Sequence, residues 1–311
     1  MKIKIFGESH APEVGVEIEG LPPRFPVDAA LLQAFLDRRA PGHGQGGLST
    51  PRLEADRAIF TSGLDAEGLT TGALVRAVIR NENVRPQDYA ASSTVPRPGH
   101  ADYAAWLKDG AIPSGGGRWS GRLTAPLCIA GGIALQLLAR RGITIASAVR
   151  PGRAAEEVPA DDSVGAIVEV VATGFPAGYG DAGAEGLESK LSAAFFAIPA
   201  VKGVEFGDGF KLAELLGSEA NDAFVLSSGV TLRTNRCGGI LGGVSVGTPI
   251  VARLAFKPTP SIAREQDSVD LATMRPAKIS VSGRHDRCVA FRGAVAAEAA
   301  MAVVLETEIF G

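Results

Sequence analysis

The feature that most constrains the fold is an apolar window from Leu123 to Ala139. It is interrupted by Pro126, Gly131 and Gly132, and arginines flank it on both sides. A membrane-spanning helix needs about 20 consecutive, predominantly apolar residues, and this window falls short of that. We therefore interpret it as the buried helix of a globular protein and expect no membrane partner.

The charge of the chain bears on its partners. The formal net charge is −3 at pH 7, which argues against a general nucleic-acid or membrane-surface binder. Of the 31 basic residues, 23 are arginine. Arginine offers a planar fork of donors that suits phosphate and carboxylate oxygens. High-GC codon usage produces the same bias, so both explanations stay open.

The cysteines and the N-terminal residues indicate a compartment. Cys128, Cys237 and Cys288 are widely spaced and form no C-x-x-C pair, so we expect neither a disulfide framework nor a zinc site. Met1 leads directly into the segment 2–6, which lacks the apolar stretch of a signal peptide. We expect a cytoplasmic protein.

Hydrophobic periodicity predicts a mixture of strands and helices. The expected strands cover residues 3–6, 15–19, 56–62, 73–81, 143–149, 164–172 and 250–256. The expected helices cover residues 29–38 with Asp28 as N-cap, 101–108, 123–141, 186–196 and 294–307. No linker, charge run or low-complexity tract divides the chain, which predicts one domain over residues 1–311.

Polar chemistry is concentrated between Arg97 and Arg122. This region contains the sequence RPGHAD at 97–102 and SGGGRWSGR at 114–122. Glycine lets a backbone approach a ligand closely, and histidine transfers protons near neutral pH. The region predicts a site for an anionic, phosphorylated small molecule.

Three of the four histidines, His10, His100 and His285, lie beside serine, arginine or acidic residues. A single histidine is more often structural or exposed than catalytic, but three in such contexts favour function. Their spacing lacks H-x-x-x-H, and nearby arginines would repel a cation. General acid–base work is therefore favoured over a metal site, and we expect no metal. The type of reaction does not follow from these residues alone.

Seven short segments occur in the order typical of one family. They are Phe6–His10, Asp37–Gly42, Arg97–Asp102, Gly115–Arg118, Gly238–Gly243, Lys257–Thr259 and Gly283–Asp286. Each is weak alone, but seven in order over nearly the whole chain are specific. The chain thus resembles the chorismate synthases.

The resemblance implies a fold and a reaction. The expected fold is α+β, a single-domain β-α-β sandwich with helices between antiparallel sheets, assembled as a homotetramer. The expected reaction is the 1,4-anti elimination of phosphate from 5-enolpyruvylshikimate 3-phosphate, which gives chorismate for aromatic amino acid biosynthesis. It needs reduced FMN without net redox change. NADPH is a candidate reductant, but the loop at 42–47 lacks the usual basic residue and favours an external flavin reductase.

The resemblance also implies roles for individual residues. His10 would be the acid for the leaving phosphate, His100 would keep the reduced flavin monoanionic, and Asp286 would help the flavin N5 region accept the C6 proton. The implied substrate-binding residues are Ser9, Arg39, Arg97, Arg122 and Arg284. The implied FMN contacts are Arg118, Trp119, Ser120, Ala200, Gly242, Lys257, Pro258, Thr259, Pro260, Ser261 and Arg284.

Three positions depart from the family pattern. Trp119 replaces a common serine, Gly121 a common alanine and Arg287 a common proline. Two alternatives stay open beside the leading interpretation. One is another FMN-dependent oxidoreductase acting on a polyanionic small molecule, which would consume reduced flavin or NADPH stoichiometrically. The other is a non-catalytic anion- or nucleotide-binding protein.

Overall fold

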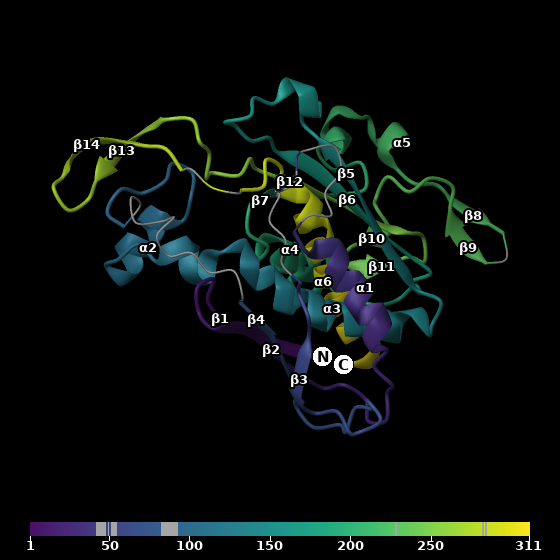
Figure 1. Cartoon of the computed structure of the whole chain (residues 1–311). Helices are drawn as coiled ribbons and strands as arrows, with labels where there is room; N and C mark the ends of the chain where they lie inside the picture. The colour runs from purple at the N-terminus through teal and green to yellow at the C-terminus, as the bar shows by residue number, and fades with distance from the viewer. Residues whose placement is uncertain are drawn as a thin grey trace.

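The first of two four-stranded antiparallel sheets is built from the N-terminal part of the chain (Figure 1). The computed structural model describes residues 1–41, 48, 50, 55–81, 93–227, 229–281, 283 and 285–311. In order across the sheet the strands are β1 (Lys2–Gly7), β2 (Glu13–Glu19), β4 (Val75–Arg80) and β3 (Ile59–Ser62). Val14, Val16 and Ile18 of β2 are fully buried, so this face of the sheet belongs to the core.

The second sheet comes from the middle and C-terminal parts of the chain. Its strands, in order across the sheet, are β5 (Thr144–Pro151), β6 (Ala166–Thr173), β12 (Ile250–Phe256) and β7 (Val201–Phe206). All neighbouring strands are antiparallel. Alternate residues of β6 and β12 are buried, as a sheet with one face on the core requires.

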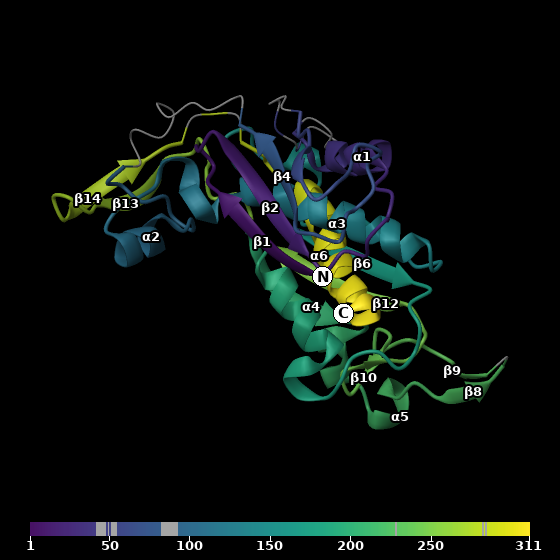
Figure 2. The ribbon, with the colours of Figure 1, turned by 90° about the horizontal axis from the view of Figure 1, so that it is seen from below.

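Four helices contribute to the same hydrophobic cluster as the two sheets. They are α1 (Ala29–Arg39), α3 (Thr124–Ala139), α4 (Leu187–Phe196) and α6 (Ala290–Phe310). Helix α3 contacts β2 and β4 of the first sheet, α6 contacts β5 and β6 of the second, and the two helices pack on each other (Figures 1 and 2). The mixed α+β class expected from the sequence is thus confirmed.

The contact between α3 and α6 depends on a small residue. A Cβ atom at Gly131 of α3 would lie 2.3 Å from the Cβ atom of Ala299 of α6. The predicted buried helix is confirmed in α3. Within the described residues, Ser114–Ala139 is the one helical stretch long and apolar enough to cross a membrane, yet 72% of its most apolar window is buried inside the protein.

The remaining elements are short and lie around these layers. The helices are α2 (Asp102–Asp109) and α5 (Gly217–Ala220). The hairpins are β8 (Phe224–Leu226) with β9 (Val230–Leu232), β10 (Ile240–Leu241) with β11 (Val244–Ser245), and β13 (Gln266–Asp270) with β14 (Arg275–Ile279). The 3₁₀ turns are η2 (Ser114–Trp119), η3 (Gly121–Leu123), η4 (Ala155–Glu157), η5 (Gly183–Glu185) and η6 (Gly209–Glu214).

Two predicted elements differ from the observed bounds by three or more residues at one end or both. The strand expected at 56–62 begins only at Ile59, because Asp56 is fully buried among arginines rather than paired in the sheet. The helix expected at 294–307 extends over Ala290–Phe310. The helix at α1 begins where it was expected, with the Asp28 carboxylate accepting from the backbone N–H groups of Ala30 and Leu31.

Candidate functional site

A cavity of about 490 Å³ lies among the segments that carry the predicted site residues. It is within the range typical of small-molecule sites. Twelve of those residues line it: Arg97, His100, Arg118, Trp119, Ser120, Arg122, Ala200, Lys257, Thr259, Pro260, Ser261 and Asp286. They come from the loop before α2, the turns before α3, the α4–β7 connection, the segment after β12 and the segment before α6. The fold thus brings together residues far apart in the sequence.

The glycine turn of η2 holds two histidines against one wall of the cavity. Gly115, Gly116 and Gly117 have φ values of 62°, 87° and 49°. A Cβ atom at Gly115 would lie 2.2 Å from Cε1 of His10, and one at Gly116 would lie 3.0 Å from Cε1 of His100. Glycine is therefore needed both for the backbone conformation and for the space that the two imidazoles occupy.

Ser9 reaches the same turn from the end of β1. Its backbone N–H donates to the Gly117 carbonyl over 3.3 Å, and its hydroxyl donates to the Ser114 carbonyl over 3.3 Å. Ser9 and His10 are thus fixed directly beside the glycine turn, although neither lines the cavity itself.

A buried carboxylate organises Arg97 and His100. Asp102 is 1% exposed and accepts from Arg97 Nε at 2.7 Å and Arg97 Nη2 at 2.8 Å. Nδ1 of His100 lies 2.6 Å from Oδ1 of Asp102. Burial alone would raise the pKa of Asp102, but the hydrogen bonds from Arg97 and His100 hold that pKa well below its ordinary value. Burial and the nearby cations lower the pKa of His100, although the hydrogen bond to Asp102 opposes them.

A second buried carboxylate, Asp56, joins Arg39 and Arg122. Its Oδ2 accepts from Arg39 Nη1 at 2.5 Å, and its Oδ1 accepts from Arg122 Nη1. Burial opposes ionisation, but the two arginines lower the pKa of Asp56. Burial also lowers the pKa of Arg39 to about 10, which leaves this arginine cationic at neutral pH.

Of this pair of arginines, only Arg122 lines the cavity. Arg39 is 1% exposed and donates further to the Thr124 hydroxyl and the Gly121 carbonyl. Arg122 also donates from Nε to the Asn81 side chain over 2.8 Å. Arg39 therefore lies behind Arg122 in this conformation.

Asp286 faces the cavity from the segment that precedes α6. Its Oδ2 accepts from Arg292 Nη1 at 2.9 Å, and its Oδ1 accepts from the backbone N–H of Thr50 at 3.1 Å. Arg292 and His285 also line the cavity. Arg284, another predicted residue, lies outside the described residues.

The segment after β12 closes another side. The Lys257 ammonium donates to the Gly99 carbonyl, and the Lys257 N–H donates to the Ala200 carbonyl over 3.0 Å. Ala200 has a φ of 76°, a left-handed conformation that costs a non-glycine residue about 1–2 kcal/mol. Such strain is often found at ligand sites. Pro258 lies within this segment but does not line the cavity.

The exposed Arg118 and the half-buried Trp119 form a rim of the cavity. The guanidinium carbon of Arg118 lies 4.3 Å from the centroid of the Trp119 ring, and Nη2 of Arg118 donates to the Asp109 carboxylate over 2.9 Å. Trp119 therefore presents a flat aromatic surface that is held by a cation.

Gly242 is a predicted contact that does not line the cavity. It occupies the β10–β11 turn, and the carbonyl of its neighbour Gly243 accepts from Leu187 N at the start of α4. The cavity lies at the opposite end of α4, near Phe196 and Ala200. A helix of this length spans about 15 Å, so the chain does not bring Gly242 to the cavity.

Sequence reasoning missed two residues of the site, Asp56 and Arg292. Asp56 was expected inside a strand, and Arg292 lies ahead of the predicted start of the last helix. A signal for Asp56 was available in the charged pair Asp56–Arg57 at the head of an otherwise apolar strand. No comparable pattern marks Arg292.

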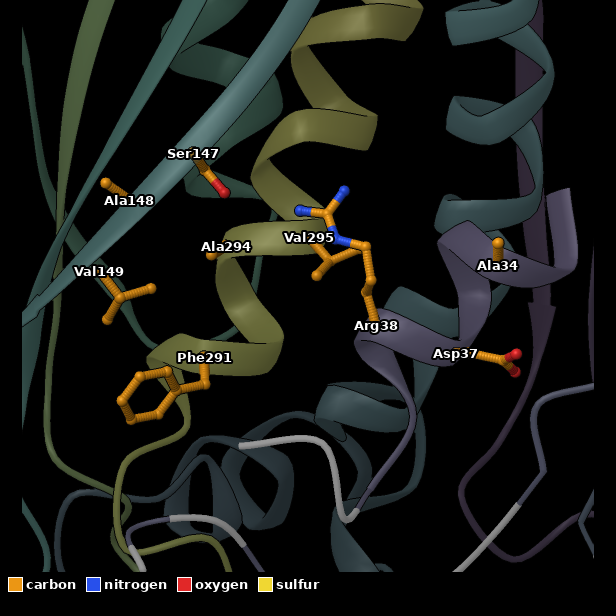
Figure 3. Close-up of a pocket in the computed structure, with 9 residues that line it drawn as sticks. All are labelled: Ala34, Asp37, Arg38, Ser147, Ala148, Val149, Phe291, Ala294 and Val295. Atoms are coloured by element: carbon orange, nitrogen blue, oxygen red, sulfur yellow. The ribbon is translucent and has the colours of Figure 1, made fainter. Parts of the chain in front are cut away.

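A second cavity of about 500 Å³ lies between α1, β5 and α6 (Figure 3). Arg38 projects from α1 towards α6, where its guanidinium donates to the buried Glu298 carboxylate over 2.9 and 2.7 Å. Ser147 of β5 donates to the same carboxylate over 2.5 Å. Arg38 thus binds Glu298 while its neighbour Arg39 binds Asp56, because adjacent helical side chains point in different directions.

Charge distinguishes the first cavity. Arg97, Arg118, Arg122, Lys257 and Arg292 line it against the single carboxylate Asp286 among its described lining residues. Glycine backbone at one wall and a flat aromatic ring at the rim complete a site suited to a planar, anionic ligand.

Comparison with known proteins gives a consistent result. A sequence model of the family described as chorismate synthase matches residues 1–158 and 152–310. A chorismate synthase of Lancefieldella parvula is 44% identical over 98% of this chain and 93% of its own length. One of Thermococcus gammatolerans is 42% identical over 98% of this chain and 94% of its own.

A solved structure of a chorismate synthase supports the fold. It superimposes with a TM-score of 0.74 at 23% identity and covers 99% of this chain and 91% of its own. Together with the sequence relatives, this confirms the resemblance that the seven ordered segments indicated. The chain belongs to the chorismate synthase family, lyases that convert 5-enolpyruvylshikimate 3-phosphate to chorismate.

Proposed function

We propose that this chain carries out the family's elimination in the 490 Å³ cavity, with reduced FMN and the substrate bound together. The observation that carries the proposal is the convergence of five cationic side chains, two of them held by buried carboxylates, on one cavity with a glycine wall. A substrate with a phosphate and two carboxylates needs such an excess of positive charge.

The substrate oxygens are assigned to Arg97 and Arg122, which line the cavity and are held rigidly by Asp102 and Asp56. Ser9 adds a hydroxyl from beside the glycine turn. Arg39 contributes positive charge from behind Arg122 in this conformation. Arg284 is retained as a predicted substrate and cofactor contact outside the described residues.

The cofactor is assigned to the side formed by the rim and the segment after β12. Trp119 offers a planar surface, while Arg118, Ser120, Ala200 and the segment Lys257–Ser261 offer charge, hydroxyls and backbone. Gly242 lies at the far end of α4, so its predicted contact would require a second copy of the chain. Reduced FMN, when bound, supplies electron density to the breaking C–O bond.

Three residues transfer or hold protons in this proposal. His10, fixed against Gly115, donates a proton to the departing phosphate. His100, which lines the cavity, would hold a proton towards the bound flavin and so favour its monoanion. Asp286, kept in place by Arg292, would assist removal of the substrate C6 proton beside the bound flavin.

We also propose a cytoplasmic homotetramer. Large apolar side chains are strongly exposed on η6, just before α5, and on β8 and β9: Phe210, Leu216, Phe224, Leu226 and Val230. Figure 1 shows α5, β8 and β9 on the same side of the molecule. Exposed apolar surfaces of this kind are typically covered by a partner. All three cysteines are free, which suits a reducing compartment.

One anaerobic assay tests the function. Protein, chemically reduced FMN and 5-enolpyruvylshikimate 3-phosphate should release phosphate and chorismate in equal amounts, with no net consumption of reduced flavin. Stoichiometric flavin oxidation would instead favour the oxidoreductase alternative. Replacing the chemical reductant with NADPH tests whether the protein depends on an external flavin reductase. The 42–47 loop, on which that expectation is based, lies outside the described residues.

A further inference from the structure

His100 has two neighbours that compete for one ring nitrogen. Nδ1 lies 2.6 Å from Oδ1 of Asp102 and 3.0 Å from Nη2 of Arg97. Arg97 can only donate, and an ionised Asp102 can only accept. The proton on the imidazole must therefore be placed by deciding which contact is a hydrogen bond.

The distances decide in favour of Asp102. An unprotonated Nδ1 would put two lone pairs 2.6 Å apart, which no hydrogen bond would compensate. Arg97 Nη2 already has its own acceptor, because it donates to Oδ1 of Asp102 over 2.8 Å. Nδ1–H therefore donates to Asp102, and the contact with Arg97 is not needed to satisfy either group.

The carboxylate is itself held in place from several sides. Its Oδ2 accepts from the backbone N–H of Arg97 at 3.0 Å and from Arg97 Nε at 2.7 Å, and Nη1 of Arg97 donates to the Ser261 hydroxyl over 3.0 Å. Asp102 is almost fully buried. A carboxylate fixed in this way selects a tautomer and orientation of a histidine, as it does in metal and protease sites.

The opposite ring edge faces the glycine turn at the cavity. Nε2 of His100 lies 3.3 Å from the position that a Cβ atom on Gly116 would occupy, and His100 lines the cavity. The charged groups around the ring are Asp102 and Arg97 from its own segment and Lys257 from the segment after β12. Burial of the ring together with the two cations lowers the pKa of His100 against the opposing effect of Asp102, which favours the neutral imidazole with a lone pair on Nε2.

We propose that Asp102 is a positioning residue that holds the proton of neutral His100 on Nδ1, so that Nε2 alone exchanges a proton with a ligand in the cavity. His100 then donates towards an anionic ligand only after Nε2 has taken a proton from solvent. Asp102 pairs with the imidazolium that forms. This inference rests on the proposed role of His100 at the flavin and adds that binding of the anionic cofactor takes up one proton.

Nitrogen NMR of the full-length protein tests the tautomer without any cofactor. The protein is labelled with ¹⁵N-histidine and measured at about pH 8, well above the ordinary imidazole pKa of about 6.5. The His100 signals are assigned by their loss in His100→Gln. We expect the proton on Nδ1 and an unprotonated Nε2. A proton on Nε2 in the unsubstituted protein would overturn the proposal, whether or not any variant folds.

Two variants test the cause. In Asp102→Asn, the amide oxygen should take the place that accepts from Arg97 N and Nε, and the amide N–H₂ should face Nδ1, so the tautomer should reverse to Nε2–H. Asp109→Asn is the matched control, because Asp109 is exposed and pairs with Arg118. It should leave the His100 signals unchanged. A folded Asp102→Asn protein that keeps Nδ1–H would contradict the positioning role.

Anaerobic addition of reduced FMN separates this inference from the proposed role of His100. Nε2 should shift to the protonated position as the cofactor binds. If the tautomer is as expected but Nε2 does not respond, proton exchange at the flavin is overturned, while the elimination itself is still judged by the phosphate assay.

Discussion

Arg292 donates from Nη1 to Oδ2 of Asp286 over 2.9 Å and thereby ties the first turn of α6 to the cavity. Its Nε donates to the Arg39 carbonyl at the end of α1 over 3.1 Å. One side chain thus fixes the carboxylate and joins two helices that the sequence separates by some 250 residues. The role proposed for Asp286 depends on this arrangement.

Replacing Arg292 should therefore impair turnover without a direct loss of chemistry. Arg292→Gln removes a hydrogen bond to a charged group, worth about 1.5–3 kcal/mol, so kcat should fall about tenfold or more. Phosphate release with chemically reduced FMN measures this. Arg264→Gln is a suitable control, because Arg264 is half-exposed and pairs with Asp161 and Asp162. Equal rates in both variants would remove Arg292 from the site.

Asp56 should contribute strongly to stability at neutral pH. Asp56→Asn leaves Arg39 and Arg122 without their shared anion, and breaking a buried pair in this way costs about 3–5 kcal/mol. Urea unfolding at pH 7 should show a loss of this size. Asp161→Asn, at an exposed ion pair, should leave the free energy of unfolding nearly unchanged.

The effect of Asp56 should also depend on pH in a defined direction. Its pKa is lowered in the folded protein, so the carboxylate stabilises the fold fully above its unfolded pKa of about 4. This contribution is lost as the pH falls through the lower, folded pKa. The stability difference between the natural chain and Asp56→Asn should therefore be constant from about pH 7 to 5 and shrink below about pH 4. A difference that grows on acidification would contradict this assignment.

The two histidines at the glycine turn should each be essential but for different reasons. His10→Ala and His100→Ala should each lower turnover by about 10²-fold, the usual scale for acid–base groups. Only His100→Ala should also weaken binding of reduced FMN, because His10 is assigned to the leaving phosphate. Full turnover in either variant would exclude that residue from the mechanism.

Much of the architecture could be predicted from local pattern. The apolar window at Leu123–Ala139 gave a buried helix because its residues are apolar on every side, and Asp28 marked the start of α1 because its carboxylate caps the helix. The three short hairpins were not predicted. Strands of two to five residues such as Ile240–Leu241 hold too few alternating positions to be recognised.

The site was predicted less completely, for a physical reason. The ordered segments predicted residues that line the cavity, such as Arg97 and Ser261. They did not predict residues that act by holding another side chain in place. Asp56 and Arg292 act through Arg122 and Asp286, and these contacts link residues 66 and 6 positions apart. Nor could the sequence tell that Arg39 would turn to Asp56 while Arg38 turned to Glu298.

The contact between α3 and α6 should tolerate little added volume. A Cβ atom at Gly131 would lie 2.4 Å from the Ala299 Cα atom, and both helices are buried there, so Gly131→Ala should destabilise by about 1–3 kcal/mol. Gly217→Ala is the matched control, since nothing lies within 4 Å of its Cβ position. Thermal unfolding of both variants should separate them. Equal midpoints would mean that the helices move apart at no cost.

Trp119 offers a direct optical test of the cofactor assignment. The chain has two tryptophans, and Trp119 lines the cavity whereas Trp106 lies on α2 and does not. Bound flavin beside the Trp119 ring should quench its fluorescence. Titration with oxidised FMN should therefore quench Trp106→Phe protein, in which Trp119 alone emits. The same titration should leave Trp119→Phe protein nearly unchanged. The reverse pattern would place the cofactor closer to α2 and remove Trp119 from its binding site.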